Sequence, residues 1–412
     1  MATKRKGKMS QALALTSSHL GRYVLIQKIA VGGVADVYLA KTKTSTQRDK
    51  YLVLKCLRAD AKDDVDFLET IINEAELSVR LRHPNIVEVF DLCEVDSRQF
   101  LAMEYLDAND LASVFNYHIR QDSYLDTGLA LFVINEIAKG LHHAHELKDK
   151  EGKPIDLVHR DISSQNILLS SSGEIKISDF GIAKTNYMRE RTPSGVIKGK
   201  FHYMSPEQAW GDKVDRRSDI FSLGIIMYEA IVGREAYPYN DIATLIEKAR
   251  IALIPQPRQV RPEIPADLEA IILKALDIDK KERYQTAAEF ADAVESYRLQ
   301  HYPRANRKAW IAHLDQIQER GAKLPLLHAS DYLRDIHSIL PQQNHSSLAQ
   351  SDDDFDITER YAIADVERAK NEKHIASYGS PSTEKQPSLL PYITVAVVLL
   401  ITIIAIFVYF IL

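Results

Sequence analysis

The run from 159 to 181 constrains this chain more than any other part of the sequence. It reads His-Arg-Asp, then an asparagine five residues after the aspartate, and ends in Asp-Phe-Gly. Between Asn166 and Asp179, apolar and polar residues alternate on both sides of a Ser-Ser-Gly turn at 171–173, which predicts a β-hairpin. Because a hairpin brings its two ends together, Asn166 and Asp179 are expected to lie close to each other.

Asp161, Asn166 and Asp179 have the side chains that phosphoryl transfer requires. That reaction needs an acceptor hydroxyl held in line and metal ions that neutralise the charge of the phosphate. Asp161 is spaced to accept the proton of the hydroxyl, and Asn166 and Asp179 supply oxygen ligands of the kind that Mg²⁺ prefers. A purely structural role for such a spaced set is the weaker interpretation.

The segment 29–37 has the composition of a loop that covers nucleotide phosphates. Gly32 and Gly33 allow backbone amides to approach phosphate oxygens closely. Ala30 and Ala35 stand where the fuller glycine pattern has glycine, so an ordinary hairpin turn remains an alternative for this segment alone.

Lys55 follows two apolar residues in an expected strand, where a lysine suggests a specific use such as holding the α- and β-phosphates. Such a lysine needs an acidic partner, and Glu74, on a helix expected over 67–82, is the best candidate. A structural salt bridge is the alternative, although surface pairs contribute little to stability. Three further histidines, 142, 143 and 145, are assigned to a helix rather than to a metal site, because adjacent histidines diverge around a helix.

The order of the expected elements predicts an α+β chain. The part from Tyr23 to about Arg120 is strand-rich with one helix, and the part from Leu125 to about Gln300 is mainly helical. A short helical extension over 301–340 has helical spacing of Trp310, Leu314 and Ile317. Residues 341–390 are too poor in apolar side chains for a core and are expected to form a flexible polar linker.

The two ends of the chain differ in composition. Residues 1–20 form a basic tail, expected to be solvated, with weak attraction to anionic lipid as the alternative. Residues 391–412 carry no charge, and a helix of that length reaches about 30 Å, the thickness of a hydrocarbon core. They are expected to form a C-terminal transmembrane anchor rather than a buried core helix, with the rest of the protein on the cytoplasmic side. The net charge of −5 gives no support for nucleic-acid binding, and two cysteines form no disulfide framework.

With these motifs the chain resembles the eukaryotic-like protein kinase superfamily, especially its bacterial Ser/Thr members. The resemblance covers about Tyr23 to Leu299 and implies a two-lobed kinase domain over 21–300, with a small N-lobe to about 106 and a larger helical C-lobe. It also implies ATP with Mg²⁺, or Mn²⁺, in the cleft. Asp219 is implied to brace the catalytic loop, and a Glu207–Arg283 pair is implied. The residues expected to contact the nucleotide are Ala30, Gly32, Gly33, Val37, Lys55, Met103, Glu104, Leu106 and Asp110.

Two positions depart from the family pattern. Most Ser/Thr kinases have lysine at the position of Ser163 and threonine at the position of Lys200. We hypothesise that the cation has moved, so that Lys200 takes the place of the missing lysine and Ser163 makes room for it; a solvated or substrate-facing Lys200 is the alternative. Arg160 beside the catalytic aspartate implies a phosphate on the activation segment, for which Thr192 and Ser194 are the best-placed acceptors.

The sequence therefore predicts a membrane-anchored Ser/Thr protein kinase in which Asp161, Lys55, Glu74, Lys200 and Ser163 serve catalysis and Asn166 and Asp179 bind the metal. Its expected partners are ATP, protein substrates, the membrane and a second copy of the chain for autophosphorylation in trans. A pseudokinase that acts as a nucleotide-binding or scaffold module is the main alternative, and a small-molecule phosphotransferase is a third.

Overall fold

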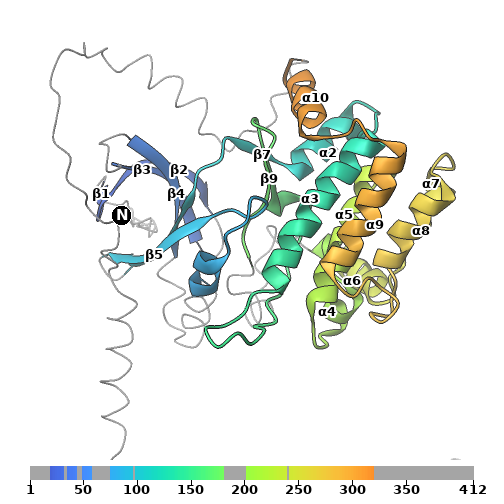
Figure 1. Ribbon diagram of the computed structural model, residues 1–412, viewed down its shortest axis with the longest axis horizontal. Coiled ribbons are helices and arrows are strands. Elements are labelled where there is room, and N and C mark those ends of the chain that lie inside the picture. Colours follow the sequence, from blue (N-terminus) through green and yellow to red (C-terminus); the bar gives the residue numbers. More distant parts are fainter. Residues whose placement is uncertain are drawn as a thin grey trace, which may run out of the picture. The chain divides into compact units, whose positions relative to one another are not determined.

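The computed structural model describes residues 19–31, 35–43, 49–57, 75–95, 98–180, 201–238 and 241–319. These residues form a strand-rich N-terminal lobe followed by a mainly helical C-terminal lobe (Figure 1), which confirms the predicted α+β order. The predicted linker over 341–390 and the predicted membrane helix over 391–412 lie outside the described residues, as does the basic tail up to residue 18. None of the helices within the described ranges combines the length and the apolar character that crossing a membrane requires.

The N-terminal lobe is built on an antiparallel six-stranded sheet with the order β1-β2-β3-β4-β6-β5. Alternate residues of the central strands face the core, as the two-residue period of a strand requires, so that Leu52, Leu54 and Phe100 are almost fully buried. The register pairs Val37 with Lys55 on neighbouring strands. The strands are β1 (His19–Leu20), β2 (Tyr23–Val31), β3 (Ala35–Lys43), β4 (Asp49–Leu57), β5 (Val89–Val95) and β6 (Arg98–Glu104).

The helix predicted over 67–82 is described only in its last part. Residues 75–80 are helical, and the helix ends before His83-Pro84, because the residue before a proline avoids the helical region. Residues 58–74, which include Glu74, lie outside the described part of the chain.

A second, three-stranded sheet has the order β7-β8-β9. Its strands are β7 (Ala108–Asp110), β8 (Ile167–Ser170) and β9 (Ile175–Ile177). Strands β8 and β9 pair Ile167 with Ile177, which confirms the predicted hairpin. The turn between them uses Gly173 with φ of +79°, a left-handed conformation that glycine adopts at little cost.

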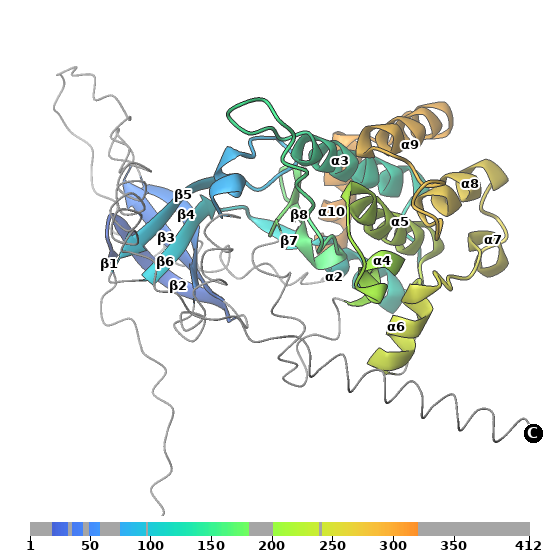
Figure 2. The same cartoon turned by 90° about the horizontal axis from the view of Figure 1, so that it is seen from below.

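The C-terminal lobe packs its helices around α5, of which nearly every residue is buried. A helix buried on nearly all sides belongs in the centre of a lobe. Helices α3 and α9 lie side by side along one face, as the two views agree (Figures 1 and 2). The helices are α2 (Leu111–Arg120), α3 (Thr127–His145), α4 (Pro206–Trp210), α5 (Arg216–Val232), α6 (Ile242–Arg250), α7 (Pro257–Val260), α8 (Ala266–Ala275), α9 (Ala287–His301) and α10 (Arg307–Glu319).

Side-chain caps fix where several of these helices begin. The carboxylate of Asp126 accepts a hydrogen bond from the amide of Leu129 at the start of α3, 2.9 Å away. Ser205 and Gln208 form a capping box at the start of α4, and Glu207, in the first turn of that helix, is buried. Helix α10 buries Trp310, Leu314 and Ile317, which confirms the amphipathic helix predicted within 301–340.

Candidate active site

The loop from 159 to 166 is held in place by the carboxylate of Asp219. Its two oxygens accept hydrogen bonds from the backbone amides of His159 and Arg160, both at 2.8 Å. A third bond, also 2.8 Å, comes from Nε2 of His145. Burial alone would raise the pKa of Asp219, but the hydrogen bonds from His145 and from the backbone, together with the charges of both histidines, hold it below its ordinary value. The implied bracing role of Asp219 is confirmed.

This support stabilises an unusual backbone. Arg160 has φ of +65°, in the left-handed region that non-glycine residues rarely adopt. The Asp219 bond to its amide and the bond from Gln208 Nε2 to its carbonyl oxygen, 2.9 Å long, fix that conformation. The direction of the adjacent Asp161 side chain is therefore set by these tertiary contacts rather than by the conformational preference of the local backbone.

Asp161 and Asn166 are joined directly. The amide nitrogen Nδ2 of Asn166 donates to the backbone oxygen and to carboxylate Oδ2 of Asp161, each at 2.7 Å. Because the nitrogen end of the Asn166 amide faces Asp161, its oxygen end faces away, in the orientation that a metal ligand needs. The Asp161 side chain is mostly buried, with 9 % of the residue exposed.

Lys55 and Asp179 form an ion pair between the N-terminal lobe and the end of the β8–β9 hairpin. Asp179 also has a positive φ, of +57°, in the left-handed region that aspartate adopts more often than most other non-glycine residues. A backbone hydrogen bond also holds the two ends of the hairpin together: the amide of Ser178, which precedes Asp179, donates to the carbonyl oxygen of Asn166 at 2.8 Å. The structure thus brings Lys55, Asp161, Asn166 and Asp179 into one constellation.

Phe180 and Met103 lie next to Asp179. The ring of Phe180 meets that of His159 edge to face, with centroids 4.6 Å apart. Met103 shares with Asp179 and Phe180 a cavity of about 20 Å³, which is the size of one water molecule. Met103 therefore lies beside the Asp-Phe-Gly segment, as a pocket-lining residue would.

The connection between the lobes is fastened by an ion pair that the sequence did not suggest. Carboxylate Oε1 of Glu104 accepts hydrogen bonds from Nζ of Lys176 on β9, at 2.6 Å, and from the amide of Glu88, at 2.7 Å. Leu106 lies in the same connection, between β6 and β7. Asp110 caps α2 by accepting a bond from the amide of Ser113, 2.7 Å away, so a contact of Asp110 with a ribose remains a prediction.

Ser163 is buried, and its hydroxyl has no hydrogen-bond partner among the residues that the structure describes. Within the same ranges, no carboxylate pairs with the guanidinium of Arg160. Several predicted residues lie outside the described part of the chain: Gly32, Gly33, Glu74, Thr192, Ser194 and Lys200. Of Ala30, only the backbone is described, in strand β2.

The donor set fits the ATP and Mg²⁺ that the motifs imply. Asn166 and Asp179 present an amide oxygen and a carboxylate, the hard ligands that Mg²⁺ takes, and Lys55 places a cation beside them. The described residues contain no cluster of three or more histidine, cysteine or acidic side chains that would form an all-protein metal cage. That is compatible with Mg²⁺, which is usually bound through one or two side chains plus substrate phosphates.

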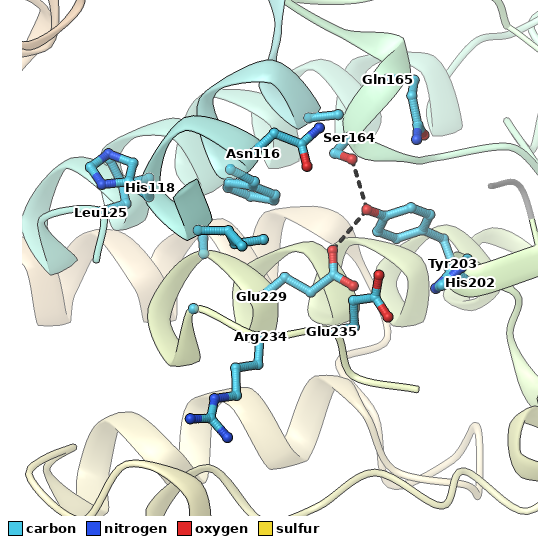
Figure 3. Close-up of a pocket in the computed structure, with 15 residues that line it drawn as sticks. Asn116, His118, Leu125, Ser164, Gln165, His202, Tyr203, Glu229, Arg234 and Glu235 are labelled. Carbon is cyan, nitrogen blue, oxygen red and sulfur yellow. Dashed lines mark hydrogen bonds between the residues drawn. The ribbon is translucent and has the colours of Figure 1, made fainter. Parts of the chain in front are cut away.

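A pocket of about 220 Å³ opens beside this loop, between α2, the end of α5 and residues 202–203 (Figure 3). The hydroxyl of Tyr203 donates to Oε2 of Glu229 and accepts from Oγ of Ser164, both at 2.7 Å. When Glu229 is ionised it can only accept, and because a phenol has one proton, the chain of bonds then runs from Ser164 through Tyr203 to Glu229. Sequence reasoning missed all three residues.

Glu229 makes the stability of the protein depend on pH. Burial raises its pKa from 4.5 to about 7, and the charge of the nearby Glu235 adds to the effect. The folded state therefore holds a proton that the unfolded state releases, so this contribution is complete below pH 4.5 and is lost as the pH rises to about 7. The loss amounts to at most about 3 kcal/mol.

We expect Glu229→Gln to flatten this part of the pH profile, since the amide keeps an acceptor for Tyr203 and carries no charge. The measurement is the free energy of unfolding in urea at several values between pH 5 and 8. Glu235→Gln, at an exposed position on the same pocket, is the matched control and should leave most of the slope in place. An unchanged slope in Glu229→Gln would contradict the assignment.

A fully buried ion pair ties α4 to the loop after α8. Arg283 donates to both oxygens of Glu207, at 2.8 and 2.9 Å, and Ser218 donates to Oε1 of the same carboxylate at 2.6 Å. Although burial opposes ionisation, these bonds hold the pKa of Glu207 below its ordinary value. The implied Glu207–Arg283 pair is confirmed.

Comparison with known proteins agrees with this geometry. The family described as "Protein kinase domain" matches residues 23–294, well over half of the chain. The chain belongs to the protein kinase family. Its kinase domain contains the whole constellation of Lys55, Asp161, Asn166 and Asp179.

The relatives are bacterial protein kinases. The tyrosine-protein kinase MasK of Myxococcus xanthus is 40 % identical over 68 % of this chain and 44 % of that protein. The serine/threonine-protein kinase PrkC of Bacillus subtilis is 35 % identical over 65 % of this chain and 39 % of that protein, and PknB of Mycobacterium tuberculosis is 34 % identical over 68 % and 44 %. The chain thus spans less than half the length of these curated relatives.

Among solved structures, the kinase domain of PknI from Mycobacterium tuberculosis is similar to this one. It has 27 % sequence identity and a TM-score of 0.52, and the match covers 69 % of this chain and 99 % of that one. The two-lobed kinase fold predicted from the motifs is therefore confirmed.

Proposed function

We propose that this chain is a protein kinase that transfers the γ-phosphate of ATP to hydroxyl groups of proteins. The observation that carries the proposal is a pair of contacts among four functional side chains: Lys55 contacts Asp179, 124 residues away in the sequence, and Asn166 binds Asp161. A binding or scaffold module has no need of a base, a phosphate-binding lysine and two metal ligands in one place, so this set argues against a pseudokinase.

Each side chain has a role in the transfer. Bound ATP with Mg²⁺ supplies the transferable phosphoryl group and a cation that neutralises its charge. Asn166 and Asp179 would hold the metal, and Lys55 would hold phosphate oxygens. Asp161 orients the acceptor hydroxyl and accepts its proton. Asp219 keeps the loop of Asp161 in its strained conformation.

The proposal is tested by incubating the purified protein with labelled ATP and Mg²⁺, alone and with a generic protein substrate. Label should enter protein, and EDTA should abolish the incorporation. Protein that binds ATP but incorporates no label under any of these conditions would favour the pseudokinase.

Serine and threonine are the proposed acceptors, in line with PrkC and PknB. Tyrosine is a second candidate, because MasK, at 40 % identity, is named a tyrosine-protein kinase. Ser163, which stands where most Ser/Thr kinases have lysine, also weakens the Ser/Thr assignment. Phosphoamino-acid analysis of the labelled product distinguishes the two: phosphotyrosine alone would overturn the Ser/Thr proposal.

The proposed place of action is the cytoplasmic face of a membrane, with residues 391–412 as the anchor and 341–390 as the linker. The uncharged composition of the last segment supports the anchor. Removal of 391–412 should move the protein from the membrane fraction to the soluble fraction, and retention in the membrane would contradict the proposal.

A second copy of the chain is the proposed partner for phosphorylation of Thr192 or Ser194, which would supply the anion that Arg160 lacks among the described residues.

Lys200 is proposed to replace the lysine that the catalytic loop lacks. The hydroxyl of Ser163 supports this, because it is buried and has no partner among the described residues, so a cation that enters there would find a hydrogen-bond acceptor. Lys200→Ala should lower kcat about 10²-fold, in the range found when one group that stabilises a transition state is removed. Lys198→Ala, two residues away, is the matched control. A rate near that of the wild type in Lys200→Ala, measured with labelled ATP, would show that Lys200 has no such role.

A further inference from the structure

Helix α10 lies beyond the range that the kinase family matches, which ends at 294, yet it packs firmly on the C-terminal lobe. Trp310 is fully buried, and Leu314 and Ile317 are at most 2 % exposed. In both views α10 lies beside α2 and the three-stranded sheet (Figures 1 and 2). Its contacts show what it holds in place.

The first contact is with the turn of the β8–β9 hairpin. Nε and Nη2 of Arg307 both donate to the carbonyl oxygen of Ser172, at 3.0 and 2.9 Å. Ile311 covers the next residue, Gly173, so closely that a Cβ there would lie 2.6 Å from Cγ1 of Ile311. The turn is therefore shaped to receive α10, through a glycine that is needed for this close approach as well as for its positive φ.

The hairpin connects this turn to the metal ligands. Asn166 immediately precedes β8, and Asp179 comes two residues after β9. At about 3.3 Å per residue the strands span only about 13 Å. A displacement of the turn is therefore transmitted along a short hydrogen-bonded ladder to Asn166 and Asp179. Helix α10 holds the outer end of the same hairpin whose inner end carries both side chains.

The second contact is with α2. The Nε2 atoms of His313 and His118 are 3.2 Å apart, and the planes of the two rings are nearly parallel, with an angle of 3° between them. Burial, and the presence of His313, lower the pKa of His118 to about 4, so His118 is neutral at physiological pH and one ring can donate to the other. Helix α2 follows β7 directly, and β7 pairs with β8. Both contacts of α10 thus reach the same small sheet.

We propose that α10 is a positioning element of the nucleotide–metal site, in which Arg307 and Ile311 fix the turn of the β8–β9 hairpin and His313 fixes α2. These are positioning residues, because they act through Ser172, Gly173 and His118 rather than on the nucleotide. The inference rests on the proposed function, since it concerns how tightly Asn166 and Asp179 hold the metal with ATP. It also extends the functional kinase unit beyond the family boundary at 294, so that the unit includes α10.

The test is direct binding of ATP by calorimetry, with and without Mg²⁺, on the full chain. The Kd for ATP without Mg²⁺, divided by the Kd with Mg²⁺, measures how much the metal contributes to binding. The double variant Arg307→Ala/Ile311→Ala should lower this ratio about tenfold, the size of effect found when groups behind metal ligands are removed. Binding of metal-free ATP should stay unchanged, which a general loss of structure would not allow.

Lys308→Ala/Gln316→Ala is the matched control, with two exposed positions on the same helix. Arg307→Met removes only the donors from an exposed side chain and should lower the same ratio by a smaller factor, which keeps the test decisive if the double variant unfolds. If both Arg307 variants keep the wild-type ratio, the inference about α10 is wrong, but the proposed function is not affected. Wild-type protein that binds no ATP would overturn the proposed function and the inference with it.

Discussion

Asp161→Asn should lower the rate of phosphoryl transfer by about 10³-fold while folding and ATP binding are retained. The asparagine has nearly the same shape and can still accept the hydrogen bond from Nδ2 of Asn166, which measures 2.7 Å in the wild type. It cannot accept the proton of a substrate hydroxyl, because an amide is not a base at neutral pH. The loss should therefore appear in kcat, with little change in KM for ATP.

Single-turnover measurements with labelled ATP isolate the chemical step from product release. Asp156→Asn is the matched control, since Asp156 lies five residues upstream and its side chain is 82 % exposed. Equal rates in the wild type and in Asp161→Asn would show that Asp161 has no role in catalysis. Background incorporation in both, with ATP bound by both, would instead support the pseudokinase.

The part of the site that the sequence predicts is the part encoded locally. The alternation around residues 171–173 was enough to predict the hairpin, and the hairpin alone brings Asn166 near Asp179. The amphipathic spacing of Trp310, Leu314 and Ile317 likewise predicted α10, because helical period and burial are properties of one segment.

Contacts between distant segments leave no such local signal. Tyr203 meets Ser164 and Glu229, which are 39 and 26 residues away, and single polar residues on buried helices have no periodic signature. His145 bonds to Asp219 across 74 residues. Its place in a helix was predicted correctly, but the direction of its ring depends on how α3 packs on α5. The surface that α10 covers was unpredictable for the same reason.

Gly128 and Gly173 show where a partial signal existed. At Gly128 a Cβ would lie 2.7 Å from Cβ of Tyr302, and at Gly173 it would meet Ile311. Because both glycines lack a Cβ, they leave room for the segment that follows α9. A glycine at the start of a helix or in a turn has several explanations in sequence, however, and only the packed structure selects the close approach.

Glu207→Gln should destabilise the protein by about 3–5 kcal/mol, because it leaves the guanidinium of Arg283 buried without a counter-charge. Arg283 is fully buried at the side chain and Glu207 is 5 % exposed, so water cannot replace the lost partner. The wild-type carboxylate also has a pKa below its ordinary value. Its contribution is therefore present above about pH 4.5 and is lost as the pH falls, and the variant should lack this acid dependence.

Equilibrium unfolding in urea at pH 7 and at pH 4 measures both effects. Glu263→Gln is the matched control, since it breaks a Glu–Arg pair of similar length, 2.8 Å, whose carboxylate is 61 % exposed. That pair lies at the surface and should contribute little to stability. Replacing both buried partners, as in Glu207→Leu with Arg283→Met, should recover part of the loss, because no unpaired charge then remains in the interior. Recovery should be incomplete, since Arg283 also donates to the carbonyl oxygens of Asp277, Arg217 and Ile278. A loss in Glu207→Gln as small as in the control would show that the buried pair stabilises the protein no more than a surface pair does.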